Sequence, residues 1–432
     1  MTRSPACKKG VSGRGDPRGR VLIMEWKDRF SAIVRDRLEE SAISVVMREA
    51  VRQGALMLSA GEPMAELYPE KELRESFQKV LAEGRVKWGY TPHRRGVPDL
   101  LRWIVDWMGH DGLLPGWVTP GDLLVTNGSQ EGMSLLSECL LDPGDRVMVE
   151  SPSYPDAMGV FRRDGVLLEG VDLLPDGPDI EAMERLLAEK KVKAFYTIPT
   201  YQNPTGFSTS DEKKERVLEL ARRHDFVIFE DDPYRNITFE KKPRGTYIRA
   251  SGDDRRVIYL GSFSKVIAPG LRLGWMIAPS PVDMALEKLR IAGTLCLPDV
   301  IQYAIRDLVD AGGLQKHLAK VRPLYKANRD ALAASLVKHA GPEGLEVDVP
   351  GGGFFIWGRI PWLKDAQAFA MEAIKNEKVA VVPGAHFYPE PGRGGDRIRF
   401  AFAAVQPDQA EEGALRLARA LKLYRAGRGG EK

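Results

Sequence analysis

The sequence predicts an α/β fold in which a mostly parallel sheet carries helices on both faces and a smaller α+β domain is attached. Between residues 123 and 230, short apolar runs alternate with longer segments of helical spacing. Polar, turn-rich loops follow these apolar runs at their carboxyl ends. The length of 432 residues allows one large domain and a smaller one. Parallel strands connected through helices account for these observations together.

The composition is that of an ordinary globular protein. The formal net charge is only +3, so nothing in it demands a nucleic acid or an anionic membrane as partner, and we expect neither. No apolar run approaches the ~20 residues of a membrane span. Cys7, Cys139 and Cys296 lie far apart without metal-like spacing. We therefore expect a reducing, cytoplasmic compartment and no metal site.

The chain begins with a basic, glycine-rich stretch, residues 1–23, that lacks the apolar segment of a signal peptide. We expect this stretch to be disordered. Met24 is a candidate start, because amphipathic sequence follows it. Apolar residues at helical spacing between Glu25 and Gln53 predict one or two helices that end at Gly54.

The remaining elements follow from hydrophobic periodicity and from turn residues. Strands are expected at 55–59, 123–126, 146–150, 194–198, 226–230, 257–260 and 273–278. Helices are expected at 72–83, 98–108, 127–140 and 211–224, and then in a long region to about 339 that is interrupted near 293–298 and 312–313. Strands at 354–357 and 397–402 indicate the second, smaller domain.

One loop, residues 261–275, sets Lys265 among serines, with Arg272 seven positions further on. An amine near hydroxyls and a guanidinium suits a phosphorylated aldehyde: Lys265 could form a Schiff base with the carbonyl. Ser262, Ser264 and Arg272 could bind the phosphate. Taken alone, this stretch fits equally well as a turn with a solvent-facing lysine.

Three further strand-end loops suit the same ligand, if it is a pyridine ring with a phenol oxygen and a phosphate. Gly128, Ser129 and Gln130 open a helix, where free N–H groups and the helix dipole favour phosphate. Tyr154 could stack on the ring, and Asn203 could donate to the phenol oxygen. The alternatives are an ordinary helix cap, a packing tyrosine and a common Asn-Pro turn.

Two more positions complete the set. Asp231 ends an apolar strand, and a desolvated acid there would keep a pyridine nitrogen protonated, while Tyr234 could reach the phenol oxygen. Arg397 and Arg399 share one face of a strand in the second domain, and an arginine fork is a natural receptor for an α-carboxylate. The alternatives are a surface turn and a surface ion pair.

These residues together resemble the class I/II group of fold-type-I, pyridoxal-phosphate-dependent aminotransferases, from about Phe30 to Leu421. The most specific motifs are Ser262-Phe263-Ser264-Lys265, Pro269-Gly270-Leu271-Arg272, Tyr201-Gln202-Asn203-Pro204-Thr205-Gly206 and Asp231–Tyr234. The resemblance implies a seven-stranded type of sheet in a large domain at 61–300, a small domain at 301–432, and an N-terminal arm at 24–60 that adds to the small domain.

The resemblance also implies the following roles. Lys265 would be the Schiff-base lysine and the proton shuttle, and Asp231 would pair with the pyridine nitrogen. Asn203 and Tyr234 would bind the phenolic oxygen, and Tyr154 would stack on the ring. Residues that would surround the phosphate are Gly128, Ser129, Gln130, Ser262, Ser264 and Arg272. Arg397, in an Arg-Ile-x-Phe element, would hold the substrate carboxylate, with help from the backbone of Gly61.

Tyr90 resembles the tyrosine that reaches a phosphate in the neighbouring subunit, which implies a homodimer with shared active sites. The implied reaction is ping-pong transfer of an amino group from an L-amino acid to a 2-oxo acid, with 2-oxoglutarate as the expected acceptor. The nearest branch contains 2-aminoadipate, kynurenine and aromatic aminotransferases and the effector domains of MocR-type regulators.

Several alternatives stay open from the sequence. Some aminoadipate enzymes carry an arginine on the early helix, where this chain offers Ser44, with Arg48 one turn on and Arg399 as a further departure. Lyase or decarboxylase chemistry on the same cofactor is one alternative function. A ligand-sensing regulator is another, although we expect such a protein to have a DNA-binding segment of some 70 residues before this domain, and few residues precede it here.

Overall fold

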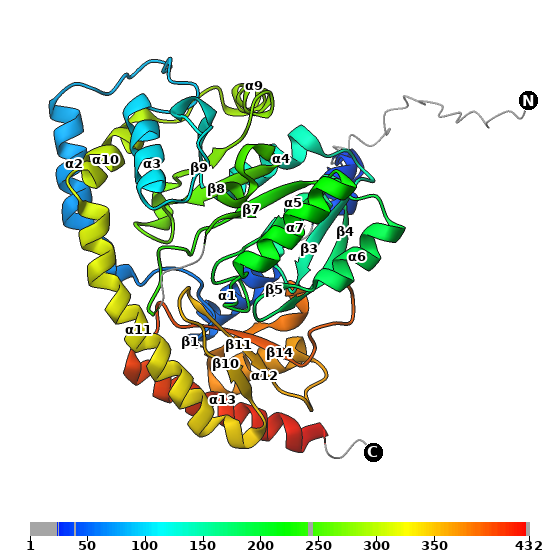
Figure 1. Ribbon diagram of the computed structural model, residues 1–432. Coiled ribbons are helices and arrows are strands. Elements are labelled where there is room, and N and C mark those ends of the chain that lie inside the picture. The colour runs from blue at the N-terminus through cyan, green and yellow to red at the C-terminus, as the bar shows by residue number, and fades with distance from the viewer. Residues whose placement is uncertain (1–23, 25, 39, 241–244, 429–432) are drawn as a thin grey trace, which may run out of the picture.

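The computed structural model describes residues 24, 26–38, 40–240 and 245–428. A larger lobe is built around a long sheet, and a smaller lobe around a second sheet (Figure 1). The prediction of disorder for residues 1–23 lies outside the described residues. Within the described part of the chain, every helix is too short or too polar to span a bilayer.

The large sheet has the strand order β2-β9-β8-β7-β6-β3-β4-β5. Its strands are β2 Leu123–Thr126, β3 Arg146–Ser151, β4 Leu167–Leu174, β5 Gly177–Pro178, β6 Ala194–Thr197, β7 Val227–Asp231, β8 Val257–Ser262 and β9 Gly274–Ile277. The central pairs, β4/β3, β3/β6, β6/β7 and β7/β8, are parallel, whereas β9 is antiparallel to both of its neighbours. This confirms the predicted mostly parallel α/β sheet. The strand β4 and the short β5 beside it were not predicted.

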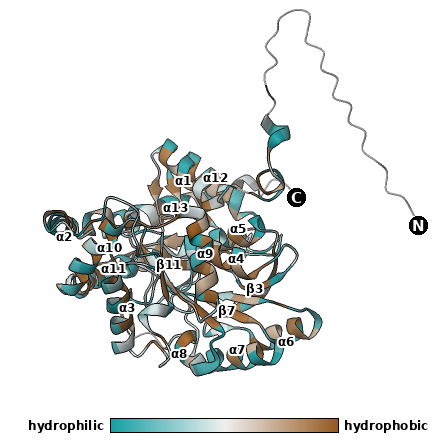
Figure 2. Ribbon diagram, turned by 90° about the horizontal axis from the view of Figure 1, so that it is seen from above, coloured by the Kyte–Doolittle hydropathy of each residue, from teal (hydrophilic) through white to brown (hydrophobic). Residues whose placement is uncertain are grey.

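The strands β6, β7 and β8 are buried almost throughout, as expected when helices cover both faces of a sheet. The flanking helices are α2 Glu70–Ala82, α3 Pro98–His110, α4 Ser129–Leu140, α5 Pro155–Arg163, α6 Ile180–Glu189, α7 Asp211–His224, α8 Tyr247–Ser251, α9 Val282–Thr294 and α10 Asp299–Asp310. In Figure 2 the strands β3 and β7 are largely hydrophobic, and polar residues lie on the outer helices such as α7.

The small lobe contains an antiparallel sheet of order β10-β11-β14-β13, which joins Glu346–Asp348, Phe355–Arg359, Arg397–Ala401 and Val382–Pro383. The helices α12 Ala366–Glu377 and α13 Pro407–Arg428 pack against each other in this lobe. The N-terminal segment joins it through β1, Leu56–Met57, which pairs with β12, Val379–Ala380. The helix α11, Gly313–His339, runs along both lobes (Figure 1).

The N-terminal segment is less regular than the periodicity suggests. Only its second half is an α-helix, α1 Ala42–Gln53, and this helix ends at Gly54 as predicted. The preceding residues form a short 3₁₀ turn, Trp26–Arg29, and a π turn, Ile33–Arg37. The interruptions predicted near 293–298 and 312–313 separate α9, α10 and α11. The domain boundaries at residues 61 and 300 stay predictions.

Candidate active site

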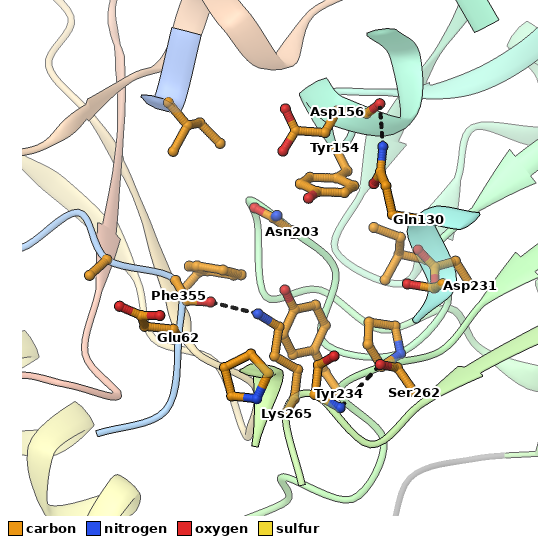
Figure 3. Close-up of a pocket in the computed structure, with 18 of the residues that line it drawn as sticks. Glu62, Gln130, Tyr154, Asp156, Asn203, Asp231, Tyr234, Ser262, Lys265 and Phe355 are labelled. Atoms are coloured by element: carbon orange, nitrogen blue, oxygen red, sulfur yellow. Dashed lines mark hydrogen bonds between the residues drawn. The ribbon is translucent and has the colours of Figure 1, made fainter. Parts of the chain in front are cut away.

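A cavity of about 350 Å³ lies at the carboxyl ends of the parallel strands, and Phe355 and Arg399 of the small lobe form part of its wall (Figure 3). Sequence-predicted residues that line it are Gly61, Ser129, Gln130, Tyr154, Asn203, Asp231, Tyr234, Ser262, Ser264, Lys265 and Arg272. The strand-end loops meet there because parallel strands present their carboxyl ends at one edge of a sheet. No cluster of metal-ligating side chains occurs among the described residues.

Lys265 follows β8 and extends into this cavity, where its Nζ donates a hydrogen bond of 2.8 Å to the carbonyl oxygen of Gly61 (Figure 3). The backbone N–H of Ser264 donates to Ser262 Oγ at 3.1 Å, which fixes the turn before the lysine. Burial lowers the pKa of Lys265 to about 8, and Arg399 and Arg272 act in the same direction. A neutral amine is therefore accessible at mildly alkaline pH, as a nucleophile or general base requires.

Asp231 is the last residue of β7, and it is 2% exposed. Its Oδ2 accepts a hydrogen bond of 2.9 Å from the hydroxyl of Tyr196, but its Oδ1 is buried without a partner among the described residues. Burial raises the pKa of Asp231 to about 7. A carboxylate oxygen that is buried and unpartnered beside a cavity suits a cationic N–H, such as that of a protonated pyridine ring.

The start of α4 has the donors that a phosphate requires. Ser129 and Gln130 open α4, whose N-terminal N–H groups have no intrahelical partner. The backbone of Gly128 has φ +77°, and a Cβ there would lie 2.9 Å from Nη2 of Arg272. Gly128 itself does not line the cavity, but it leaves room for the arginine. Arg272 Nη2 donates to the carbonyl oxygen of Asn127 at 2.8 Å, which holds the guanidinium at the helix end.

Tyr154, Asn203 and Tyr234 also face the cavity (Figure 3). Arg399 Nη1 donates to Asn203 Oδ1 at 3.0 Å, so the amide NH₂ of Asn203 stays available to donate to a ligand. Burial raises the pKa of the Tyr234 hydroxyl, and Asp231 acts in the same direction, so this hydroxyl is protonated at neutral pH. The donors, the aromatic face, the orphaned acid and the lysine fit pyridoxal phosphate.

The expectation for Arg397 is corrected by the structure, because Arg399 lines the cavity and Arg397 does not. In the register of the small sheet, the cavity residue Phe355 pairs with Ala401, and Arg397 pairs with Arg359 at the far end of β14. Arg397 lies 3.6 Å from Asp396 and is partly exposed. Both arginines share a face of the strand, as alternation requires, but Arg397 is two residues too far from the cavity.

Arg399 is 2% exposed, and its guanidinium lies 4.3 Å from the centre of the Phe355 ring. Its two Nη atoms donate to Asn203 and to the carbonyl oxygen of Ser59, while its Nε is buried without a partner among the described residues. Burial lowers the pKa of Arg399 to about 10, which leaves it charged at neutral pH. It forms no ion pair with any described residue, so a carboxylate ligand would supply the missing counter-charge.

Two other expectations concern residues away from the cavity. Tyr90 is 83% exposed and does not line it, so its role rests entirely on a neighbouring subunit. Arg48 is exposed and pairs with Glu40 at 2.5 Å, and it does not line the cavity either. Ser44 lines an adjoining cavity rather than this one.

Sequence reasoning missed several cavity residues. They are Ile43, Met47, Glu62, Asp156, Ile198 and Phe355. Glu62 comes directly after the predicted residue Gly61, and Asp156 is two residues after the predicted residue Tyr154. This closeness in sequence could have indicated both. Ile43 and Met47 are four residues apart on α1, so they lie on the same face of the helix. From the sequence alone, such a pair indicates an ordinary face packed against the core.

The chain resembles known proteins over most of its length. A family model described as aminotransferase class I and II matches residues 54–417. The 2-aminoadipate transaminase of Thermus thermophilus is 31% identical over 92% of this chain and 98% of that protein. Aromatic-amino-acid aminotransferase 1 of Thermococcus litoralis is 32% identical over 89% of this chain and 92% of that protein. A crystal structure of the Thermus α-aminoadipate aminotransferase with N-(5'-phosphopyridoxyl)-L-leucine superposes with a TM-score of 0.85 at 30% identity, covering 93% of this chain and 100% of that one.

Proposed function

The chain belongs to the class I and II aminotransferase family and is a pyridoxal-phosphate-dependent aminotransferase, and from this premise we propose the residues that carry the reaction. The observation that carries the assignment is that the amine of Lys265 and the orphaned Oδ1 of Asp231 share one cavity. The two groups attract each other but form no ion pair, because Lys265 Nζ bonds to the carbonyl oxygen of Gly61 and Asp231 Oδ1 has no partner among the described residues; the cofactor uses both.

Pyridoxal phosphate, when bound, supplies an aldehyde that exchanges amines and a protonated ring that withdraws electrons from the substrate α-carbon. Asp231 would hold the ring nitrogen, and Asn203 and Tyr234 would hold the phenol oxygen. Tyr154 would pack against the ring. Ser129 and Gln130 at the start of α4, together with Ser262, Ser264 and Arg272, would hold the phosphate.

Lys265 is the catalytic base in this proposal. Its lowered pKa makes a neutral Nζ available, and this atom takes the proton from the α-carbon of the amino donor and later returns a proton. Arg399 receives the α-carboxylate and so fixes the α-carbon relative to Nζ, which is a positioning effect. The amino donor leaves as a 2-oxo acid before the acceptor binds, and we propose 2-oxoglutarate as that acceptor.

The side chain of the donor would lie against Ile43 and Met47 of α1 and against Phe355. This apolar wall favours aliphatic or aromatic donors. Arg48 and Arg399 were the candidates to bind the acidic side chain of a donor. Arg48 lies outside the cavity, and we assign Arg399 to the α-carboxylate, so neither is left for an acidic side chain. The relative from Thermococcus litoralis is named for aromatic amino acids and that from Thermus thermophilus for 2-aminoadipate, so the preference rests on the apolar wall and not on the relatives.

We propose that the protein is a homodimer in which Tyr90 reaches the phosphate bound by the partner subunit. Tyr90 and the nearby Trp88 are 83% and 86% exposed, which is unusual for large aromatic side chains and is explained if a second copy covers them. The cytoplasmic location stays a prediction.

A panel of amino donors with 2-oxoglutarate and pyruvate as acceptors tests this function. We expect higher kcat/KM for aromatic and aliphatic donors than for 2-aminoadipate, and turnover of glutamate in the reverse direction, since glutamate is the product of the proposed acceptor. Product 2-oxo acid that forms without amination of the acceptor would instead indicate a lyase or decarboxylase. Binding of the cofactor without turnover of any donor would argue against an enzyme.

A further inference from the structure

Asp231 depends on one neighbouring side chain in the described part of the protein. The hydroxyl of Tyr196 donates to Asp231 Oδ2 at 2.9 Å, and this is the single hydrogen bond to that carboxyl group from any described residue. Arg235, the nearest basic residue along the chain, pairs instead with the next acid, Asp232. The contact to Tyr196 therefore has no substitute.

The sheet brings the two groups together. Tyr196 on β6 pairs in register with Phe229 on the adjacent strand β7, and Asp231 lies two residues after Phe229. Residues two apart on a strand share a face, so Tyr196 and Asp231 project from the same side of the sheet. The tyrosine reaches one step along the strand direction to the carboxyl group, and the cavity begins beyond it.

The tyrosine is rigidly held. It is fully buried, and the ring of Phe161 on α5 packs against it edge-on with 5.8 Å between centroids. Burial raises the pKa of its hydroxyl far above the usual range, so the hydroxyl stays protonated and acts as a donor. Because the ring of Tyr196 is held in place, its hydroxyl also fixes the rotamer of the Asp231 carboxyl group that accepts the hydrogen bond.

Because the hydroxyl occupies Oδ2, the carboxyl group is oriented with Oδ1 free. Oδ1 is the oxygen that the proposed function assigns to the ring nitrogen of the cofactor. Burial and the nearby Asp232 both disfavour the ionised form of Asp231, while Tyr196 and Lys265 favour it. Of these two groups, Lys265 changes its protonation during the proposed reaction, whereas Tyr196 stays protonated throughout.

We propose that Tyr196 is a positioning residue for the transamination reaction: it holds Asp231 ionised and turned toward the ring nitrogen. Tyr196 does not line the cavity, so in this proposal it acts through Asp231 and not by contact with substrate or cofactor. This inference rests on the proposed function, since it presumes that Asp231 pairs with the ring.

The test is Tyr196→Phe, which removes one oxygen and retains the buried ring. The expected results are an unchanged fold, about tenfold weaker binding of pyridoxal phosphate by the apoprotein, and about tenfold lower kcat, the effect of one hydrogen bond to a charged group. The acid limb of the pH profile of kcat moves to higher pH, because a carboxyl group without its donor binds protons more readily. Cofactor binding is followed by absorbance, independently of turnover.

A matched control is Tyr259→Phe. Tyr259 is another buried tyrosine of this sheet, and its hydroxyl lies 3.4 Å from Oδ2 of Asp232, which does not line the cavity. We expect cofactor affinity and kcat within about twofold of the wild type. An effect equal to that of Tyr196→Phe would mean that loss of any buried hydroxyl in this sheet disturbs the site, which would overturn the proposal.

Asp231→Asn, alone and combined with Tyr196→Phe, separates the possible failures. If Tyr196 acts through Asp231, the second substitution adds less than twofold to the loss in cofactor affinity caused by Asp231→Asn. Full multiplication of the two effects, or a Tyr196→Phe variant with wild-type affinity and pH profile, would overturn the role of Tyr196. Wild-type behaviour of Asp231→Asn would overturn the proposed function of Asp231 itself.

Discussion

Arg399 and Asn203 come from different lobes and meet in the cavity, where Arg399 Nη1 donates to Asn203 Oδ1 at 3.0 Å. The small-lobe strand β14 supplies the arginine, and a loop after β6 supplies the asparagine. Each side chain thereby orients the other: Asn203 keeps its NH₂ for a ligand, and Arg399 keeps its remaining donors for a carboxylate. In the proposed function, recognition of the cofactor and of the substrate would be coupled through this contact.

Arg399→Lys is expected to raise KM for the amino donor by about 100-fold, because a single ammonium cannot reproduce the two-pronged contact to a carboxylate in a buried site. Steady-state kinetics with a good donor measures the effect. The paired variant Arg397→Lys, on the same strand and face, should leave KM within about twofold. If KM rose more in Arg397→Lys than in Arg399→Lys, Arg397 and not Arg399 would be the residue that binds the substrate carboxylate.

Lys265→Ala should lower kcat by at least about 10³-fold, since the general base is lost, while the protein still folds. It should also lose the visible absorbance band that the wild-type protein shows with bound cofactor. The residual rate is expected to respond to added small amines, which can enter the space left by the side chain. Full-rate turnover by this variant would remove Lys265 from the mechanism.

The acidity of Asp231 predicts a pH-dependent stability in the cofactor-free protein. Burial raises the pKa of Asp231 in the folded protein to about 7. Between the lower pKa that Asp231 has in the unfolded chain and pH 7, the folded protein therefore keeps a proton on Asp231 that the unfolded chain has lost. The contribution of protonated Asp231 to the free energy of unfolding is fully present below the pKa of Asp231 in the unfolded chain. It is lost as the pH rises through 7. Asp231→Asn should therefore become more stable than the wild type as pH rises, by up to about 4 kcal/mol above pH 7.

Urea unfolding of the cofactor-free wild type and Asp231→Asn between pH 4 and pH 8 measures this difference. Titrating groups distant from Asp231 contribute equally to both proteins and cancel, whereas Lys265, whose pKa the Asp231 charge raises, belongs to the measured difference. A stability gap that is constant over this range would show that Asp231 titrates as an ordinary carboxyl group.

Light scattering of the purified protein should give the mass of a dimer, if Tyr90 serves the partner's site. Tyr90→Phe should then weaken cofactor binding by about tenfold without changing the mass, because only a hydrogen bond to the phosphate is lost. Trp88→Phe is the matched control for a neighbouring exposed aromatic residue, and we expect its cofactor affinity to be unchanged. A monomer with full cofactor affinity would contradict both proposals.

Much of the large sheet could be predicted because its strands are buried on both faces and read as continuous apolar runs, as in 194–198 and 226–230. The strand β4, Leu167–Leu174, escaped because it lies near an edge, with exposed and half-buried positions that interrupt the apolar pattern. The irregular turns before α1 escaped for a related reason: amphipathic spacing indicates a buried face but does not distinguish an α-helix from tighter or wider turns.

In the site, residues that follow a strand were predictable because topology places every strand end at one edge. The arginine was not, since an arginine followed three residues later by phenylalanine occurs twice, at Arg397 and at Arg399. Only the register with β11 decides between them. Tyr196 could not be predicted because it lies inside an apolar strand. Its role becomes visible only when the pairing with β7 places its hydroxyl beside Asp231.

The helix α11 belongs to both hydrophobic cores. Leu314, Leu318 and Val321 pack in the core of the large lobe, whereas Leu332 and Leu336 pack in that of the small lobe. In the proposed function, a substrate held by Arg399 at one end and by the strand-end loops at the other would span the same two lobes. Substrate affinity and the spacing of the lobes are thus thermodynamically linked: a substitution in α11, far from any reacting atom, can change how tightly a carboxylate is held.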